Sequence, residues 1–246
     1  MKYIESVQNK KIKELTKLHT KKERDKQALF LVEGIHMVKE AKASRILKDI
    51  YILEGKENPT DMEATYCTQV VMNKLSVQNS DANWIGVCQK PVFKNHEEHK
   101  ILLLQDVQDP GNVGTLIRTA YSFGFDAIYM SKSCADPFNA KTLQSSQGAV
   151  FHLPIYNCDI LDTIEDKKQS IQIFATALHH DSIALQDASP IGDFGIVMGN
   201  EGQGLSNEVI EACSQCIKIE MDRFESLNVA IAGAICMYSL KMKSAS

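Results

Sequence analysis

Residues 109–120, DPGNVGTLIRTA, follow the apolar run ILLLQDV at 101–107 and form a corner between two elements. The apolar run predicts a buried strand, and the spacing of the apolar residues after it predicts a helix. We expect Asn112 to cap that helix, with Gly114 and Arg118 on its polar face. The stretch fits either a capped surface helix with a solvated arginine or an anion-binding arginine beside a helix N-terminus.

The alternation of apolar strands and helices continues to the end of the chain. Strands that are apolar throughout and separated by helices indicate a parallel sheet covered on both faces. A shorter alternation occupies 28–93, and the polar run KNHEEHK at 94–100 fits a linker. We therefore predict an α/β protein with two domains, 1–93 and 101–246, and ligand sites at the carboxyl ends of the second domain's strands. The strands expected there are 101–107, 125–131, 170–178, 194–200 and 216–221, and the helices 113–123, 139–148 and 228–243.

The composition is that of an ordinary globular protein. The 246 residues are 44% hydrophobic and 24% charged. No apolar run approaches the ~18 residues of a membrane helix, and the N-terminus lacks the apolar stretch of a signal peptide. Seven scattered cysteines fit a reducing compartment better than a disulfide framework, so we expect a cytoplasmic protein.

Charge is unevenly distributed along the chain. The formal net charge is −4, but residues 1–26 hold nine Lys or Arg against four Asp or Glu, a net +5 that leaves −9 for the rest. An acidic total argues against a nucleic-acid partner, whereas a basic segment can still contact phosphates. Apolar residues recur at rough helical spacing in this basic lead-in, so it also fits a solvated amphipathic helix, and the two interpretations are compatible.

A second polar corner, GNEGQGLS at 199–206, follows the strand expected at 194–200. It departs from the phosphate-binding P-loop pattern because Leu205 stands where lysine is required and Glu201 adds a negative charge. We therefore exclude a triphosphate ligand and expect a tight glycine loop that displays one carboxylate, with Ser206 capping the next helix. A plain turn with an exposed glutamate is the alternative.

A third corner contains Ser226 and Asn228 at the start of a helix of small and apolar residues. The small residues at 230–234 allow close packing against a neighbour, and a helix that is apolar all round is buried in a core or a subunit interface. Taken singly, Ser226 and Asn228 are better explained by helix capping than by ligand binding.

We do not expect a metal site. Cys213 and Cys216 form one CSQC pair, but a zinc site normally requires a second pair of ligands, and the sequence offers no matching one. The adjacent His179 and His180 suit no single metal well.

The three corners, in this order, resemble the three signature motifs of the SpoU (TrmH-type) RNA ribose 2′-O-methyltransferases of the SPOUT class. The matching stretches are DPGNVGTLIRTA, IVMGNEGQGLS, and IKIEM followed by ESLNVAIA. Upstream, LFLVEGIHMVKEA and WIGVCQKP are similar to the small ribosomal-protein-like α/β domain that many members use to recognise RNA. The resemblance implies a parallel-sheet catalytic domain with a deep C-terminal trefoil knot, S-adenosylmethionine as co-substrate, and a homodimer through the knot and the terminal helix. It also implies an RNA substrate, ribosomal rather than transfer RNA.

The resemblance assigns site residues by position, in two overlapping groups. The donor-binding group is Leu178, Gly199, Asn200, Glu201, Ile219, Met221, Leu227 and Asn228, and the catalytic group is Asn112, Arg118, Glu201, Ser226 and Asn228.

The chain departs from the family pattern in the third motif. Glu220 replaces a proline, and only the four residues 222–225 separate Met221 from Ser226, without the usual glycine. We expect this change to alter donor affinity and to leave Arg223 available to RNA.

Arg118 matches an arginine that has been proposed as a general base in this family. A free guanidinium, with a pKa above about 12, is a poor proton acceptor. We therefore expect Arg118 to hold the adjacent phosphate and stabilise the developing alkoxide, with Asn112 orienting Arg118 or the ribose. Glu201 is expected to anchor Arg118 or the loop, and Ser226 and Asn228 to position ribose and donor. The alternatives are a SPOUT enzyme that methylates a base and a non-catalytic RNA-binding member of the fold.

Overall fold

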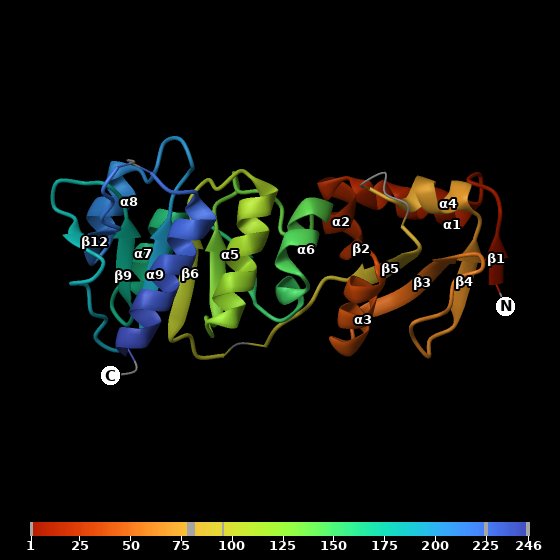
Figure 1. The fold of residues 1–246 in the computed structure, drawn as a ribbon, viewed down its shortest axis with the longest axis horizontal. Coiled ribbons are helices and arrows are strands. Elements are labelled where there is room, and N and C mark those ends of the chain that lie inside the picture. Colours follow the sequence, from red (N-terminus) through yellow and green to blue (C-terminus); the bar gives the residue numbers. More distant parts are fainter. Residues whose placement is uncertain (1, 78–81, 95, 224–225, 245–246) are drawn as a thin grey trace. The chain divides into compact units, whose positions relative to one another are not determined.

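The chain folds into two compact units in the computed structural model (Figure 1). Among the described residues, no helix is long and apolar enough to cross a membrane. The structure describes residues 2–77, 82–94, 96–223 and 226–244. Unit 1 comprises Met1–Val92 and Phe138–His152, and unit 2 comprises Phe93–Pro137 and Leu153–Ser246.

Unit 1 is built on a mixed five-stranded sheet. Its strands are β1 (Lys2–Ile4), β2 (Leu29–Glu33), β3 (Leu47–Leu53), β4 (Ala64–Cys67) and β5 (Trp84–Gln89). Its first helices are α1 (Lys10–Thr16), the 3-10 turn η1 (Lys17–His19), α2 (Lys21–Gln27), α3 (Ile35–Ala43) and α4 (Gln69–Leu75). The strand order is β1-β4-β3-β5-β2, with β5 antiparallel to both of its neighbours and the other pairs parallel. The α/β character expected of this part of the chain is confirmed.

The basic lead-in is part of the body of unit 1. Lys2–Ile4 pairs with β4, and the Asn9 side chain caps α1 by accepting the N–H of Lys11. The apolar residues at helical spacing, Ile12, Leu15 and Leu18, are buried in one cluster with residues of α4. The lysines of the same helices are exposed, so the segment is amphipathic, as its spacing suggested.

The segment 138–152 also belongs to unit 1 by its contacts. It contains α6 (Ala140–Ser146) and the 3-10 turn η2 (Ala149–Phe151). The ring of Phe30 lies 4.8 Å from that of Phe138 and 5.9 Å from that of Phe151, between centroids. The expected helix is present and ends just before Gly148, where Gln147 and Gly148 are left-handed. The domain boundaries expected from the sequence stay a prediction.

Unit 2 holds a seven-stranded sheet. Its strands are β6 (Lys100–Leu104), β7 (Ala127–Met130), β8 (Ile155–Asn157), β9 (Gln172–Thr176), β10 (Ile183–Ala184), β11 (Phe194–Met198) and β12 (Gln215–Lys218). Its helices are α5 (Pro110–Ser122), α7 (Ile160–Lys167), α8 (Asn207–Ala212) and α9 (Val229–Ser244). Four of these elements, β8, β10, α7 and α8, were not assigned from sequence, although Ser206 was expected to cap a helix where α8 begins.

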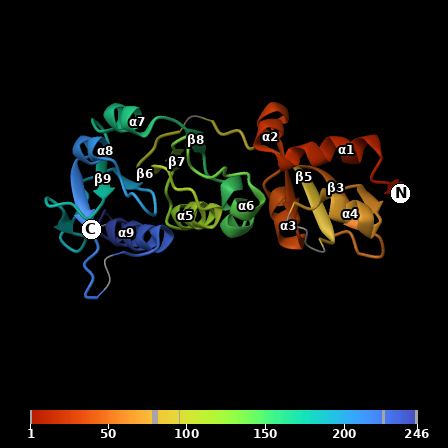
Figure 2. The same ribbon diagram turned by 90° about the horizontal axis from the view of Figure 1, so that it is seen from above.

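Every strand pair in the second sheet is parallel, in the order β10-β12-β9-β11-β6-β7-β8. Figure 2 shows α5 and α9 on one face of this sheet and α7 and α8 on the other. The parallel sheet covered on both faces is confirmed. Because β6 and β11 are neighbours, the corners that follow them lie side by side.

The terminal helix α9 packs closely on α5. A Cβ added at Gly233 would lie 2.4 Å from Cδ2 of the buried Leu116, so any larger residue would force that side chain to move. The apolar sequence of α9 suggested a helix buried all round, in a core or a subunit interface. Within this chain, only one side of the helix is buried. One side packs on unit 2, while four large apolar side chains on the other side are exposed: Ile231, Ile235, Tyr238 and Met242.

Candidate active site

The first corner differs in one detail from the sequence-based expectation. Asp109, not Asn112, caps α5, because Asp109 Oδ1 accepts the N–H of Asn112 at 2.9 Å. Pro110 occupies the first helical position, where its fixed φ suits the helix and its missing N–H is not needed. The Asp-Pro pair was the signal for this boundary. Asn112 therefore lies inside the first turn with its side chain available to other partners.

Asn112 joins all three corners. Its Nδ2 donates to Oε1 of Glu201 at 3.0 Å, and its Oδ1 accepts Nδ2 of Asn228 at 2.9 Å. Of the five residues expected to act in catalysis, these three thus form one hydrogen-bonded chain. The carboxylate of Glu201 can only accept, which fixes the orientation of the Asn112 amide.

The carboxylate of Glu201 is held in its ionised form. Burial raises the pKa of Glu201, but hydrogen bonds from the Asn112 side chain and from backbone amides, including those of Gln108 and Asp109, outweigh that effect and hold the pKa below 4.5. The first corner therefore receives a fixed negative charge from the second.

The glycine loop at 199–204 is closed on itself. Asn200 and Gly204 exchange two backbone hydrogen bonds of 3.1 and 2.9 Å. A Cβ at Gly199 would lie 2.5 Å from the backbone of Gly204, and Gly204 has a φ of +70°. Glycine is therefore required at both positions.

A side chain that sequence reasoning missed ties this loop to the first corner. Gln105, at the end of β6, donates through Nε2 to Ser206 Oγ at 3.2 Å and accepts the N–H of Ser206 at 3.0 Å. Ser206 also caps α8 by accepting the N–H of Val209, which confirms the expected cap. Nothing in the sequence near Gln105 signals a partner a hundred residues away.

Asn228 has two roles at the third corner. Its Oδ1 accepts the N–H groups of Ala230 and Ile231, so it caps α9, while its Nδ2 binds Asn112. The cap expected from the sequence is confirmed, and the same side chain also contacts Asn112, while a role of Asn228 in ligand binding stays a prediction. Ser226 is exposed beside it. The shortened loop 222–225 lies partly outside the described residues, which omit 224–225.

A cleft of about 480 Å³ opens beside the glycine loop, at the carboxyl ends of β9, β11 and β12. Asn228 of the expected donor-binding group lies next to it rather than on its wall. The other seven members line it: Leu178, Gly199, Asn200, Glu201, Ile219, Met221 and Leu227. Ser226 and His179 line it too, and the sequence had not assigned His179 to the donor site.

Arg118 lies on the exposed face of α5, and its guanidinium makes no hydrogen bond or ion pair with any residue that the structure describes. The expected contact between Arg118 and Glu201 is therefore absent among these residues, and Glu201 binds Asn112 instead. Gly114, expected on the polar face, is buried. An exposed arginine without a protein partner remains available to an anionic ligand.

The cysteine pair is not part of a metal-binding group within the described ranges. Burial raises the pKa of Cys213 to about 12, and Cys216 Sγ lies 3.1 Å from the hydroxyl of Ser182. One other group, His179, His180 and Asp181, brings ligand atoms within 4.8 Å of one another. His180 and Asp181 are exposed and already paired with each other at 2.9 Å. The expectation of no metal stays a prediction.

Comparison with known proteins agrees with this geometry. Residues 99–238 match the SpoU rRNA Methylase family, and residues 9–86 match the MRM3-like substrate binding domain. The chain belongs to the SpoU rRNA methylase family. It is 37% identical over 248 residues to the 23S rRNA (guanosine(2553)-2′-O)-methyltransferase RlmP of Bacillus subtilis (strain 168), covering 98% of this chain and all of that protein.

Solved structures show the same fold over nearly the full length. A crystal structure of an RNA 2′-O ribose methyltransferase has a TM-score of 0.84 at 27% identity, covering 99% of both chains. The AdoMet-bound rRNA methyltransferase of Sinorhizobium meliloti has a TM-score of 0.84 at 25% identity, covering 97% of this chain and 96% of the other.

These findings confirm the expected family, the SPOUT-type α/β fold and the substrate-binding domain. At the level of the family they also confirm a methyltransferase of RNA ribose 2′-hydroxyls that uses S-adenosylmethionine. The trefoil knot, the roles of individual site residues and the homodimer stay predictions.

Proposed function

We propose that this SpoU methyltransferase modifies the 2′-hydroxyl of a guanosine in 23S ribosomal RNA. The observation that carries the proposal is the hydrogen-bonded chain Glu201–Asn112–Asn228, which brings the three motif corners together beside one cleft. The identity to the Bacillus subtilis enzyme over its whole length supports the choice of nucleotide and RNA.

The cleft fits S-adenosylmethionine in size and in chemistry. Its ~480 Å³ lies within the range of small-molecule sites, and its wall combines apolar side chains with the residues of the glycine loop. A Cβ at Gly199 would push that loop open, so the wall depends on glycine there. The donor supplies an electrophilic methyl group, and the residues expected to hold it are the seven expected members that line the cleft, together with the neighbouring Asn228.

The site residues act mainly by position and charge. Arg118, permanently charged and free of protein partners among the described residues, holds the phosphate next to the target ribose and stabilises the alkoxide that forms as the hydroxyl loses its proton. Asn112, fixed between Glu201 and Asn228, holds the start of α5 against the glycine loop. Ser226, exposed at the mouth of the cleft, positions the ribose.

The lysines of α1 and α2 provide an RNA-binding surface on unit 1. The Lys17 ammonium donates to the Glu14 carboxylate. Lys17, Lys10 and Lys26 together lower the pKa of Glu14, so lysines of α1 and α2 lie near the same carboxylate. Exposed lysines of this kind contact phosphates without regard to sequence. Base recognition then falls to other groups.

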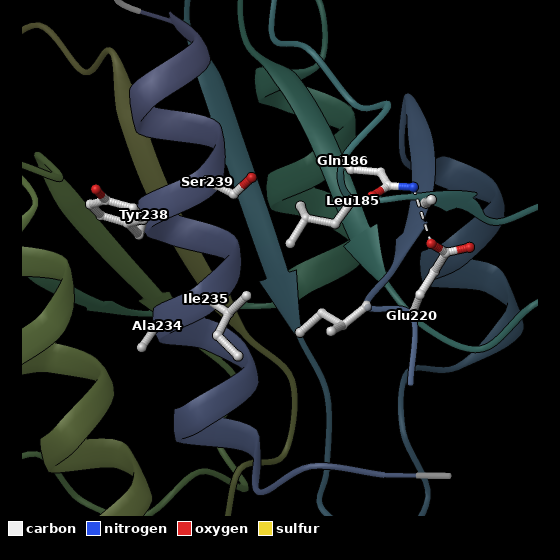
Figure 3. Close-up of a pocket in the computed structure, with 9 residues that line it drawn as sticks. Leu185, Gln186, Glu220, Ala234, Ile235, Tyr238 and Ser239 are labelled. Carbon is white, nitrogen blue, oxygen red and sulfur yellow. Dashed lines mark hydrogen bonds between the residues drawn. The ribbon is translucent and has the colours of Figure 1, made fainter. Parts of the chain in front are cut away.

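The exposed side of α9 supports a homodimer. Ile235 and Tyr238 on this helix, with Leu185 and Glu220 opposite, border a hollow of about 510 Å³ (Figure 3). Figure 3 also shows the hydrogen bond from Gln186 to Glu220 that closes its far side. A second copy that covers this face would remove from water the apolar side chains left exposed in the single chain.

The direct test is methylation of 23S ribosomal RNA by the purified protein and labelled S-adenosylmethionine. We expect one guanosine that resists alkaline cleavage and carries a ribose methyl group by mass spectrometry. Methyl transfer to a base would identify the base-methylating alternative. Absence of donor binding in calorimetry at millimolar concentration would identify the non-catalytic one.

Arg118→Ala tests the assigned role of the arginine. Loss of a charge that stabilises the alkoxide should lower methyl transfer at least ~10²-fold. Donor affinity should stay within a few-fold, because Arg118 does not line the cleft. Arg118→Lys, which keeps the charge but not the planar fork, should retain part of the activity. Full activity in Arg118→Ala would contradict the assignment.

A further inference from the structure

Asp106, two residues after β6, has a left-handed backbone conformation, which aspartate tolerates better than most residues but which still costs energy. Its φ of 58° lies in the left-handed region, which is unfavourable for an L-residue. Three other described non-glycine residues have a positive φ, namely Ala28, Arg45 and Gln147. Each stands at or next to a helix end, where this conformation is common. Asp106 follows a strand, so another interaction must hold it.

Ser131 provides that interaction through two hydrogen bonds. The N–H of Asp106 donates to Ser131 Oγ at 2.9 Å, and the Ser131 hydroxyl donates to Asp106 Oδ1 at 2.6 Å. Ser131 follows β7, the neighbour of β6, and its own N–H donates to the carbonyl of Leu104 at 3.0 Å. Both the backbone and the side chain of Asp106 are therefore fixed from the adjacent strand.

Asp106 in turn fixes Asn200. Its carbonyl oxygen accepts Nδ2 of Asn200 at 2.8 Å. The Oδ1 of the same amide accepts the N–H groups of Gly202 at 2.8 Å and Gln203 at 3.0 Å. The orientation of this one amide therefore determines how the glycine loop curls.

We propose that Ser131 and Asp106 are positioning residues of the methyltransferase site. Acting through Asn200, they hold the glycine loop in its donor-binding shape and aim Glu201 at Asn112. Neither residue lines the cleft, so their effect on the donor is indirect. The inference rests on the proposed function, in which this loop binds S-adenosylmethionine.

Ser131→Ala is the principal test. The change removes the acceptor of the Asp106 N–H and the donor to its carboxylate, so the left-handed turn loses its support. We expect S-adenosylmethionine to bind about tenfold more weakly or worse in calorimetry. We also expect faster amide hydrogen exchange at Gly202 and Gln203 in the protein without donor. Ser131→Thr keeps the hydroxyl and should restore both measurements.

Substitutions at Asp106 and a distant serine complete the set. Asp106→Asn keeps an accepting oxygen and tolerates a positive φ, so donor affinity and loop exchange should stay near those of the wild type. Asp106→Ala loses both features, so both measurements should change as they do in Ser131→Ala. Ser170→Ala is the matched control: among the described residues the Ser170 hydroxyl donates only to the Lys167 carbonyl, at 3.2 Å, so this variant should bind donor normally.

A double-mutant cycle with Asn200→Ala tests the route of the effect. If Ser131 acts through Asn200, Ser131→Ala should weaken donor binding little further in the Asn200→Ala background. Fully additive losses, or normal donor affinity and loop exchange in Ser131→Ala, would overturn the inference alone. A wild-type protein that binds no S-adenosylmethionine would overturn the proposed function and this inference together.

Discussion

Asn112 shows why the candidate site needs an amide at this position. One group must donate to the Glu201 carboxylate and accept from Asn228, and the planar amide of asparagine offers a donor and an acceptor on the same carbon. Its partners lie 89 and 116 residues away along the chain. The sequence could therefore identify Asn112 by motif, but could not show what its side chain binds.

Glu201 carries a pH dependence at the residue scale. Burial raises its pKa, but the hydrogen bonds from the Asn112 amide and from backbone N–H groups lower the pKa by more than burial raises it. The net result is a pKa below 4.5. A carboxyl whose folded-state pKa is depressed stabilises the fold fully above its unfolded-state pKa and loses that effect as pH falls through the folded value. We expect the difference in Tm between wild type and Glu201→Gln to be constant near neutral pH and to shrink as the pH falls below 4.5. Thermal denaturation across pH measures it, and a difference unchanged through the acid range would contradict the expectation.

At the element scale, the strands and helices that repeat an apolar pattern were predicted well, whereas the single residues that cap or turn the chain were not. The strand before Asp109 and the helix after it follow from apolar spacing, yet the cap proved to be Asp109 rather than Asn112. The short strand Ile155–Asn157 and the helix Ile160–Lys167 went unassigned, because runs this short carry little periodic signal. The left-handed turn at Asp106 falls on a residue type that tolerates it, but one aspartate is too weak a signal to predict the turn.

The glycine loop supplies a matched pair of substitutions. Gly199→Ala would place a Cβ 2.5 Å from the carbonyl carbon of Gly204, so the loop must open. We expect a loss of about 1–3 kcal/mol in unfolding free energy and donor binding weaker by about tenfold. In Gly202→Ala the nearest atom to the new Cβ is Asn200 Oδ1 at 3.6 Å, so stability should change by less than about 0.5 kcal/mol. Equal effects of the two changes, by calorimetry and denaturant unfolding, would contradict the steric argument.

At the scale of the whole molecule, the motifs predicted which corners meet, and the topology explains how. The first and second corners follow neighbouring strands, β6 and β11. The third follows β12, which β9 separates from β11, so strand order alone would keep it apart. It reaches Asn112 because α9 packs on α5 at Gly233. This return path depends on helix packing, which no local pattern encodes.

The exposed face of α9 predicts the oligomeric state. Ile235→Glu would place a charge in the proposed dimer interface, which should weaken association by about 100-fold or more. Sedimentation equilibrium measures the effect, with Ser170→Glu as the control at a distant exposed site. A wild-type chain that sediments as a monomer at every accessible concentration would rule the dimer out.

The lysine surface of unit 1 predicts a salt dependence. Replacing Lys10 and Lys13 with alanine should weaken RNA binding and reduce the slope of log K against log salt by about 0.7–0.9 for each phosphate that the variant no longer neutralises. Lys168→Ala is the control, because that lysine lies in unit 2 and is paired with Glu165 at 2.6 Å. Fluorescence anisotropy across salt concentrations gives both values. An unchanged slope in the double variant would place the phosphate-binding groups elsewhere.

Asn228 and α9 also impose an order on biosynthesis. Unit 1 and the first corner leave the ribosome well before the helix that completes the site, because Asn228 follows Asn112 by 116 residues. A nascent chain can therefore complete unit 1 once Phe138–His152 has emerged, and on the proposed function it can begin to engage RNA while its cleft still lacks the wall that α9 supplies. On the proposed function, we expect methyl transfer only after the last helix has docked on α5. Chains stalled or cleaved before α9 should occupy RNA without modifying it and compete with the finished enzyme.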